Sequence, residues 1–265
     1  MKINTVYNEN CLDTMKRMPD NFVDLTVTSP PYDNLRTYHG YSFDFESIAK
    51  ELFRVTKKGG VVVWVVGDAT IKGSETGTSF KQALYFKEIG FNLHDTMIYQ
   101  KKSCYAHDPR NMRYKAIFEY MFILSKCKPK TYNEIKDVKN KHAGKILKGT
   151  AGRDKKGNKR KLKDIVISDF QARSNIWMLS TDHKSNHPAI FPEKLANDHI
   201  ISWSNENDLV YDPFAGSGTT LKMAKLNKRN YIGSEVAKEY IPIINQRISP
   251  AATEGGSQLS LSDGM

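Results

Sequence analysis

The stretch LVYDPFAGSGTT at residues 209–220 decides the fold. Its first three residues are apolar and predict a short strand, and the turn that follows contains two glycines. That turn opens a predicted helix that ends near Leu226, and a second predicted strand, 230–235, ends on Glu235, 23 residues after Asp212. This succession of strand, glycine turn, helix, strand and acid is typical of one nucleotide-binding half of a doubly wound α/β sheet.

The residue types in this turn indicate which ligand it could bind. Gly216 and Gly218 allow a sharp turn and a close approach of a ligand, and Glu235 could accept hydrogen bonds from both hydroxyls of a ribose. A phosphate-binding loop is excluded because no lysine follows Gly218, and a dinucleotide motif is excluded because Leu221 replaces its third glycine. Asp212 would repel a phosphate but suits a cationic ligand. We therefore expect an adenosine that carries a sulfonium and an ammonium group.

A second motif, Ser29-Pro30-Pro31-Tyr32, directly follows a predicted strand at 24–28. Two prolines cannot continue a strand ladder, so the motif turns away at the carboxyl edge, where such sheets bind ligands. The Ser29 hydroxyl and the Pro30 carbonyl could both accept hydrogen bonds from an exocyclic amine, and Tyr32 could stack on a planar base. The amine nitrogen would then face a methyl donor. Taken alone, such a motif is more often only a rigid diproline turn, which is common in loops.

Basic residues are concentrated in one part of the chain. The 265 residues carry 40 Lys and Arg against 29 Asp and Glu, a net charge of +11, and residues 136–163 hold twelve Lys or Arg and two Asp, a net charge of +10. Glycines interrupt any periodicity there, which predicts a loop-rich insertion. Such charge favours contact with a nucleic acid, and a solvated surface loop is the alternative. The candidate DNA contacts are Lys155, Lys156, Lys159, Arg160 and Lys161, and also Arg110, Arg113 and Arg173, each of which could instead close a surface ion pair.

Together the two motifs resemble those of the DNA amino-methyltransferases, which methylate cytosine N4 or adenine N6. The catalytic motif of that family has the pattern [DNS]-P-P-[YF], and its cofactor motif is similar to residues 212–219. The catalytic motif comes first here, the basic segment lies between, and the cofactor motif comes last, an order similar to that of the family's β group. The resemblance implies an α/β fold with a doubly wound, mostly parallel sheet of the S-adenosylmethionine-dependent methyltransferase type and an inserted basic target-recognition region.

The resemblance also implies a division of the chain and a set of site residues. Residues 1–126 would form the catalytic part of the methyltransferase domain, 127–175 the basic target-recognition insertion, 176–250 the cofactor-binding part of the same domain, and 251–265 a flexible tail. The expected catalytic residues are Ser29, Pro30, Pro31 and Tyr32. The expected contacts with S-adenosylmethionine are Asp212, Pro213, Phe214, Ala215, Gly216, Ser217, Gly218, Thr219 and Glu235, with His187, Phe191 and Pro192 at the methionine end.

The resemblance indicates duplex DNA as the substrate, with the target base flipped out of the stack. The form Ser-Pro-Pro-Tyr is most often associated with N4-cytosine enzymes, and Asp-Pro-Pro-Tyr with N6-adenine enzymes, so we expect cytosine N4 with adenine N6 as the alternative. An inactive nucleic-acid-binding relative and an RNA or protein-glutamine methyltransferase also stay open, although Asn-Pro-Pro-Tyr is usual in the latter. A cognate restriction endonuclease would be a natural partner, and monomer and homodimer are both compatible with the sequence.

The periodicity of apolar residues predicts the remaining elements. Helices are expected at 45–55, 79–89 and 192–203, and strands at 61–66, 91–100 and 117–125. Gly59-Gly60 is expected to break the chain before the strand at 61–66.

Smaller features narrow the class of protein. The three cysteines form no C-x-x-C motif, which favours a reducing cytoplasm and argues against a disulfide framework, and Cys11 and Cys127 are expected to be buried or half-buried. A metal pair from His183 and His187 is disfavoured because Pro188 breaks the helix that it would need. The longest apolar run, 61–66, is far too short to span a bilayer. Asn10 stands where many relatives carry an acid, so it is either a turn residue or a ligand contact.

Overall fold

The structure is a computed structural model that describes residues 1–31, 43–102, 112–149, 151–153, 157–161, 163–180 and 192–249. The chain divides into two compact units, one comprising 1–133 with 175–265 and the other 134–174. The first unit contains both motifs that the sequence analysis singled out, and the second contains the whole basic segment 136–163.

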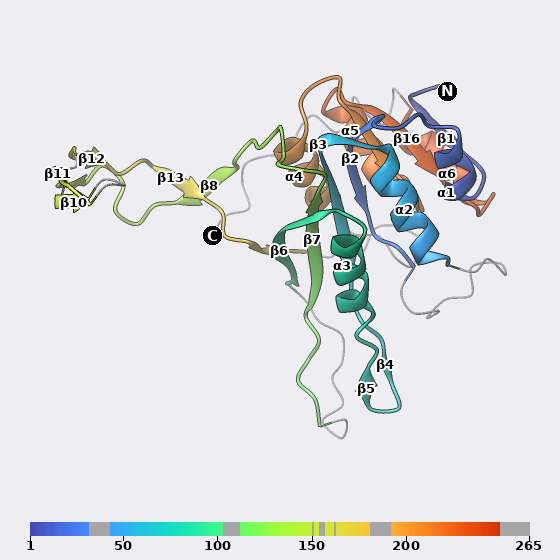
Figure 1. Ribbon diagram of the computed structural model, residues 1–265, viewed down its shortest axis with the longest axis horizontal. Helices are drawn as coiled ribbons and strands as arrows, with labels where there is room; N and C mark the ends of the chain where they lie inside the picture. The colour runs from blue at the N-terminus through green and yellow to red at the C-terminus, as the bar shows by residue number, and fades with distance from the viewer. Residues whose placement is uncertain are drawn as a thin grey trace. The chain divides into compact units, whose positions relative to one another are not determined.

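The first unit is built on one sheet. In the described residues it has eight strands in the order β1-β16-β15-β2-β3-β7-β6-β14, and every neighbouring pair is parallel except the two that involve β7 (Figure 1). In that order the strands are Thr5–Tyr7, Asn230–Ser234, Leu209–Asp212, Val23–Thr28, Thr56–Val66, Phe118–Ser125, Asn92–Lys101 and Ile176–Leu179. This arrangement confirms the expected mostly parallel sheet.

Helices cover both faces of this sheet. The helices α1 (Cys11–Lys16), α2 (Phe45–Val55) and α3 (Thr78–Glu88) pack on one face, and α4 (Glu193–Trp203), α5 (Thr219–Leu226) and α6 (Tyr240–Arg247) pack on the other. The central strand β3 shows why its sequence is uniformly apolar. Alternate residues of β3 enter different cores, Val61 and Val63 toward α4–α6 and Val62 and Trp64 toward α1–α3. A strand buried on both faces needs apolar residues at every position.

The expected break at Gly59-Gly60 is wrong, because β3 begins at Thr56 and runs through both glycines. Val23 of β2 lies opposite Thr56 while Leu25 lies opposite Val61, so the extra residues of β3 form a bulge. Gly59 has a left-handed φ of +81°, and a Cβ on Gly60 would lie 2.9 Å from the Asp24 carbonyl oxygen. Glycine is therefore required here to let the bulge fit against β2.

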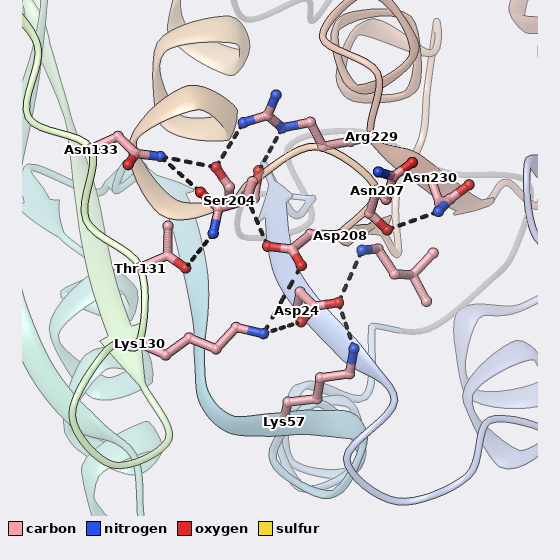
Figure 2. Close-up of polar contacts among 12 residues, drawn as sticks. Asp24, Lys57, Lys130, Thr131, Asn133, Ser204, Asn207, Asp208, Arg229 and Asn230 are labelled. Carbon is pink, nitrogen blue, oxygen red and sulfur yellow. Dashed lines mark hydrogen bonds and ion pairs between the residues drawn. The ribbon is translucent and has the colours of Figure 1, made fainter.

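A buried carboxylate ties the amino ends of several strands together (Figure 2). Asp24 of β2 is 3% exposed and accepts hydrogen bonds from Lys57 Nζ at 2.6 Å, from Lys130 Nζ at 2.7 Å and from the Leu209 amide at 3.0 Å. Burial alone would raise the pKa of Asp24, but the bonds from Leu209, Lys130 and Lys57 lower it below its ordinary value. Asp24 thus joins β2, β3, β15 and the segment after β7 at the end of the sheet opposite the two motifs.

The second unit is a ribbon of antiparallel strands. Its pairs are β8 (Lys136–Lys139) with β13 (Phe170–Ala172), β9 (Ile146–Leu147) with β12 (Ile165–Val166), and β10 (Ala151–Arg153) with β11 (Lys159–Lys161). Most of residues 136–163 lie outside these short strands, as expected for a loop-rich segment, but the nested antiparallel pairs themselves were not predicted, because they have no hydrophobic period. Four apolar side chains on β9 and β12 are exposed.

A further short hairpin, β4 (Thr70–Ile71) with β5 (Ser74–Glu75), follows β3. In the part of the chain that the structure describes, every helix is too short or too polar to cross a membrane.

Candidate active site

The two sequence motifs meet at the carboxyl edge of the sheet. Strands β2 and β15 are parallel neighbours, with Val210 opposite Leu25 and Tyr211 opposite Thr26. The chain therefore leaves both strands at the same edge, into residues 29–31 on one side and the turn 213–218 on the other. A buried hydrogen bond of 2.7 Å from Thr28 Oγ1 to Asp212 Oδ1 joins the two exits.

The glycine turn is held by hydrogen bonds from its backbone amides to Asp212 and to β16. Asp212 Oδ1 accepts a hydrogen bond from the Phe214 amide at 3.1 Å, and the Ala215 amide donates to the Ser234 carbonyl oxygen at 2.9 Å. Gly216 and Gly218 both have left-handed φ values, +51° and +81°. Gly218 is the residue before α5, and only glycine adopts this conformation there without strain. The turn is thus a rigid connection between β15 and α5.

Asp212 is enclosed within this connection, with an exposed fraction of 1%. Burial raises its pKa to about 6, and hydrogen bonds from the Thr28 hydroxyl and the Phe214 amide keep it from rising further. The carboxylate therefore braces the turn against β2. A direct contact between Asp212 and a cationic ligand stays a prediction.

Glu235 lies directly after β16 on the other side of the turn. Its Oε2 accepts a hydrogen bond from the Gly216 amide at 2.7 Å and its Oε1 from the Ala237 amide at 2.8 Å. Burial raises its pKa, and the bonds from the Ala237 and Gly216 amides oppose that rise. Each carboxylate oxygen can accept a second hydrogen bond, so the group keeps capacity for two hydroxyls of a ligand.

The proline motif is described only in part. Ser29 is half-buried, Pro30 is buried and Pro31 is half-buried, while Tyr32 lies outside the described residues. The expected cofactor contacts His187 and Phe191 also lie outside them, and Pro192 is buried immediately before α4. The structure therefore brings Ser29–Pro31, the turn and Glu235 to one edge.

The expected DNA contacts are placed unevenly. Lys159 is exposed on β11, and the backbones of Arg160 and Lys161 continue that strand. Arg113 pairs with Glu75 at 3.5 Å, and Arg173 Nε donates to Asp137 Oδ1 at 2.7 Å, so both close ion pairs in the structure. Arg110, Lys155 and Lys156 lie outside the described residues.

The structure also bears on the expectations for Asn10 and for the cysteines. The Asn10 side chain accepts a hydrogen bond from the Leu12 amide at 2.9 Å and so caps α1, which agrees with the turn-residue alternative. Cys11 is buried, but the expectation for Cys127 is wrong, because Cys127 is exposed in a left-handed turn with φ +66°. The pair His183 and His187, for which metal binding was disfavoured, lies outside the described residues. Among the described residues, no three His, Cys, Asp or Glu side chains gather closely enough to hold a metal ion.

Comparison with known protein families shows which family the chain belongs to. The family of N6/N4 methyltransferases, described as DNA methylase, matches residues 23–246, which span both motifs and the basic segment.

The chain belongs to this DNA methylase family.

Relatives and solved structures agree with that membership. The methylase is 59% identical over 239 residues to the orphan methyltransferase M.BamHII of Bacillus amyloliquefaciens, covering 86% of this chain and 89% of that protein. Its fold is similar to that of the cytosine-N4-specific PvuII DNA methyltransferase, with a TM-score of 0.70, 23% identity, and coverage of 92% of this chain and 86% of the other. It is also similar to a modification methylase of Thermus thermophilus complexed with S-adenosylmethionine, with a TM-score of 0.64, 21% identity and 92% coverage of both chains.

The family uses S-adenosylmethionine, the cofactor expected from the sequence. The residues of this methylase fit S-adenosylmethionine. Glu235 is a buried carboxylate whose oxygens can each accept one more hydrogen bond, and it lies beside the glycine turn, whose backbone is held in place. Gly218 has a second reason to be glycine, besides the left-handed φ that the sharp turn requires. A Cβ there would lie 2.9 Å from Ile244 Cγ2, so this glycine lets α6 approach the turn.

Sequence reasoning missed the two threonines that support the site. Thr28 donates to Asp212, and Thr220 Oγ1 donates to the Val27 carbonyl oxygen at 3.1 Å. A signal was present, because most hydroxyl groups on buried strands and helices have a hydrogen-bond partner nearby. What the sequence could not show is which buried group each hydroxyl would meet.

Proposed function

We propose that this methylase transfers a methyl group from S-adenosylmethionine to the exocyclic N4 amine of cytosine in duplex DNA, after the base has left the stack. The observation that carries the proposal is the buried Thr28–Asp212 hydrogen bond, which joins the proline motif to the glycine turn. Because the two exits are locked together, a base held by one and a cofactor held by the other would meet in a constant geometry. Such alignment is a main source of catalysis for a reaction without a covalent enzyme intermediate.

Each part of the site has a role in this proposal. S-adenosylmethionine, when bound, supplies an activated methyl group. Glu235 would accept hydrogen bonds from the ribose hydroxyls. The Ser29 hydroxyl and the Pro30 carbonyl oxygen would accept both N–H groups of the target amine and favour the positive charge that develops on its nitrogen. Tyr32 would stack on the flipped base and offset part of the cost of unstacking.

The choice of base rests on the sequence motif. Ser29 replaces the Asp that is more usual before Pro-Pro-Tyr in N6-adenine enzymes, and the structurally similar PvuII enzyme is described as cytosine-N4-specific. The residues 127–175 would act as the target-recognition region and contact phosphates through their lysines and arginines. The similarity to a methyltransferase described as an orphan favours action without a cognate endonuclease.

Mass spectrometry of nucleosides tests the base directly. Plasmid DNA incubated with the protein and S-adenosylmethionine should contain N4-methylcytosine. The appearance of N6-methyladenine would overturn the base and keep the mechanism, and 5-methylcytosine would refute both. Unmodified DNA together with methylated tRNA or protein would indicate a different substrate class.

A kinetic measurement tests the role of Ser29. Ser29→Ala should lower kcat by about 100-fold, the scale for a lost transition-state contact, while the Kd of S-adenosylmethionine stays within about two-fold. Glu235→Ala should do the reverse and weaken cofactor binding by about ten-fold or more. Equal effects of the two variants on Kd and kcat would contradict the division of roles.

A further inference from the structure

The helix α6 packs directly on the glycine turn, although nothing in its sequence suggests a part in the site. Ile244 of α6 is fully buried, and its side chain occupies the space that a Cβ on Gly218 would take, 2.9 Å away. One turn further along α6, Arg247 reaches the same segment. The turn is therefore bounded by β2 on one side and by α6 on another.

Arg247 bonds the turn through one nitrogen. Its Nη1 donates to the Ser217 carbonyl oxygen at 3.0 Å, to Ser217 Oγ at 2.6 Å and to Thr219 Oγ1 at 3.2 Å. These acceptors flank Gly218, the left-handed residue that precedes α5. The guanidinium thus fixes the backbone on both sides of the residue where the turn becomes a helix.

The other nitrogen of Arg247 reaches a second segment. Its Nη2 donates to Glu193 Oε1 at 2.5 Å, and the same carboxylate accepts bonds from Lys222 Nζ of α5 at 2.8 and 3.1 Å. Glu193 is the first residue of α4 and follows Pro192, at the end of the segment expected to line the methionine end of the cofactor. Arg247 therefore bridges the two segments between which the cofactor is expected to lie.

The bridge is charged and partly shielded from solvent. Burial alone would raise the pKa of Glu193, but the hydrogen bonds from Lys222 and Arg247 lower it, so the carboxylate is ionised at neutral pH. A guanidinium presents several N–H donors in one rigid plane and can bond two segments at once, which the single ammonium of lysine cannot do in the same way. An arginine at position 247 is therefore suited to fixing the distance between the glycine turn and the start of α4.

We propose that Arg247 is a positioning residue for S-adenosylmethionine, which sets the gap between the glycine turn and the start of α4 through Ser217 and Glu193. This inference rests on the cofactor site of the proposed function. Arg247 acts through these two segments rather than by touching the reacting atoms. Its loss should therefore weaken cofactor binding and leave the chemical step at saturating cofactor nearly unchanged.

The experiment compares variants on both sides of the bridge with a matched control. Arg247→Met keeps the length and packing of the side chain and removes its donors, and Glu193→Gln removes the charge on the other side. The control is Lys225→Met, because Lys225 Nζ donates to the Ile248 carbonyl oxygen at 2.7 Å and so also ties α5 to the end of α6, away from the turn. Calorimetry gives the Kd of S-adenosylmethionine, steady-state assays give kcat and KM, and circular dichroism gives Tm.

If Arg247 positions the cofactor, its loss should change Kd and KM for S-adenosylmethionine but not kcat. Arg247→Met should raise Kd and the KM for S-adenosylmethionine by about ten-fold, with kcat within about two-fold of the wild type. Glu193→Gln should raise Kd by a smaller factor, and Arg247→Lys should recover part of the loss. Lys225→Met should leave Kd unchanged even where it lowers Tm by the same amount.

Three outcomes would overturn the inference. One is an unchanged Kd in a folded Arg247→Met variant while Glu235→Ala loses binding, which leaves the cofactor site intact without a role for Arg247. Another is a rise in Kd for Lys225→Met as large as that for Arg247→Met. That result would show that any loss of contacts to α6 weakens cofactor binding. If Arg247→Met does not fold, Glu193→Gln serves as the test in its place. The third outcome that would overturn the inference is an unchanged Kd of S-adenosylmethionine in Glu193→Gln. An unchanged Kd in Glu235→Ala would instead show that the proposed cofactor site is wrong, and this result is distinct from a failure of the role of Arg247.

Discussion

At the scale of single residues, the site depends on hydroxyl groups that satisfy buried charge. Asp212 would be costly to bury without donors, and Thr28 supplies one of them at 2.7 Å. Thr26, two residues earlier on the same strand, is equally buried, yet its Oγ1 has no hydrogen-bond partner among the described residues. The two threonines therefore lie on the same strand and are equally buried. They differ in that only the Thr28 hydroxyl makes a hydrogen bond to Asp212.

This pair makes a controlled prediction. Thr28→Val should lower the free energy of unfolding by about 1–3 kcal/mol, because it leaves the buried Asp212 carboxylate short of a donor. Thr26→Val should leave stability unchanged or increase it, since no bond is lost and an unused hydroxyl is removed. Urea unfolding at neutral pH measures both. Equal destabilisation by the two substitutions would show that strand packing, and not the bond to Asp212, is what matters.

At the scale of elements, the predictions from sequence were best where the signal was local. The helix predicted at 45–55 is α2, with the same bounds, and the helix predicted at 192–203 differs from α4 by one residue. The bulge in β3 was missed because it depends on how closely β2 approaches Gly60. The role of α6 was missed because Arg247 and Ser217 are 30 residues apart, and nothing local connects them.

The element-scale prediction concerns the amino ends of the strands. Asp24→Asn should lower the free energy of unfolding at pH 7 by about 1–3 kcal/mol, because two lysines and the Leu209 amide lose a charged acceptor. The folded-state pKa of Asp24 is lowered, so its stabilisation is present above the unfolded-state pKa of about 3.9 and is lost as the pH falls below it.

Urea unfolding at pH 7 and pH 3 tests this. The difference between wild type and variant should shrink at the lower pH. Asp13→Asn is the surface control, since Asp13 pairs with Lys16 at 3.3 Å on the exposed side of α1 and should cost less than about 0.5 kcal/mol. A difference for Asp24→Asn that persists unchanged at pH 3 would contradict the electrostatic explanation.

At the scale of the whole molecule, charge and chemistry are carried by different units. The unit 134–174 holds most of the net positive charge, and the other unit holds the sheet with both motifs. The composition of residues 136–163 predicted this separation, because a segment so rich in charge cannot build a core of its own. It could not predict the antiparallel ribbon, whose strands lack any apolar period.

The whole-molecule prediction is a salt dependence. Replacing Lys159, Arg160 and Lys161 together by glutamine should reduce the slope of log K for duplex DNA against log salt by up to about 2.7, if each contacts one phosphate. Binding of S-adenosylmethionine should be unaffected, because these residues lie in the other unit. Fluorescence anisotropy over a range of salt concentrations gives the slope. A slope and affinity equal to those of the wild type would mean that the charged run is only solvated.

The adjacency of β2 and β15 also has a consequence for how the protein is made. The hydrogen bond between Thr28 and Asp212 joins residues 184 positions apart, so all of the intervening chain is synthesised before this bond can form. At about 5–20 residues per second this takes on the order of ten to forty seconds. During that interval the central strands of the growing chain have no neighbour on that edge, and pairing over such a separation is slow. Cofactor affinity therefore arises late in synthesis, and the nascent chain is most exposed to aggregation before β15 leaves the ribosome.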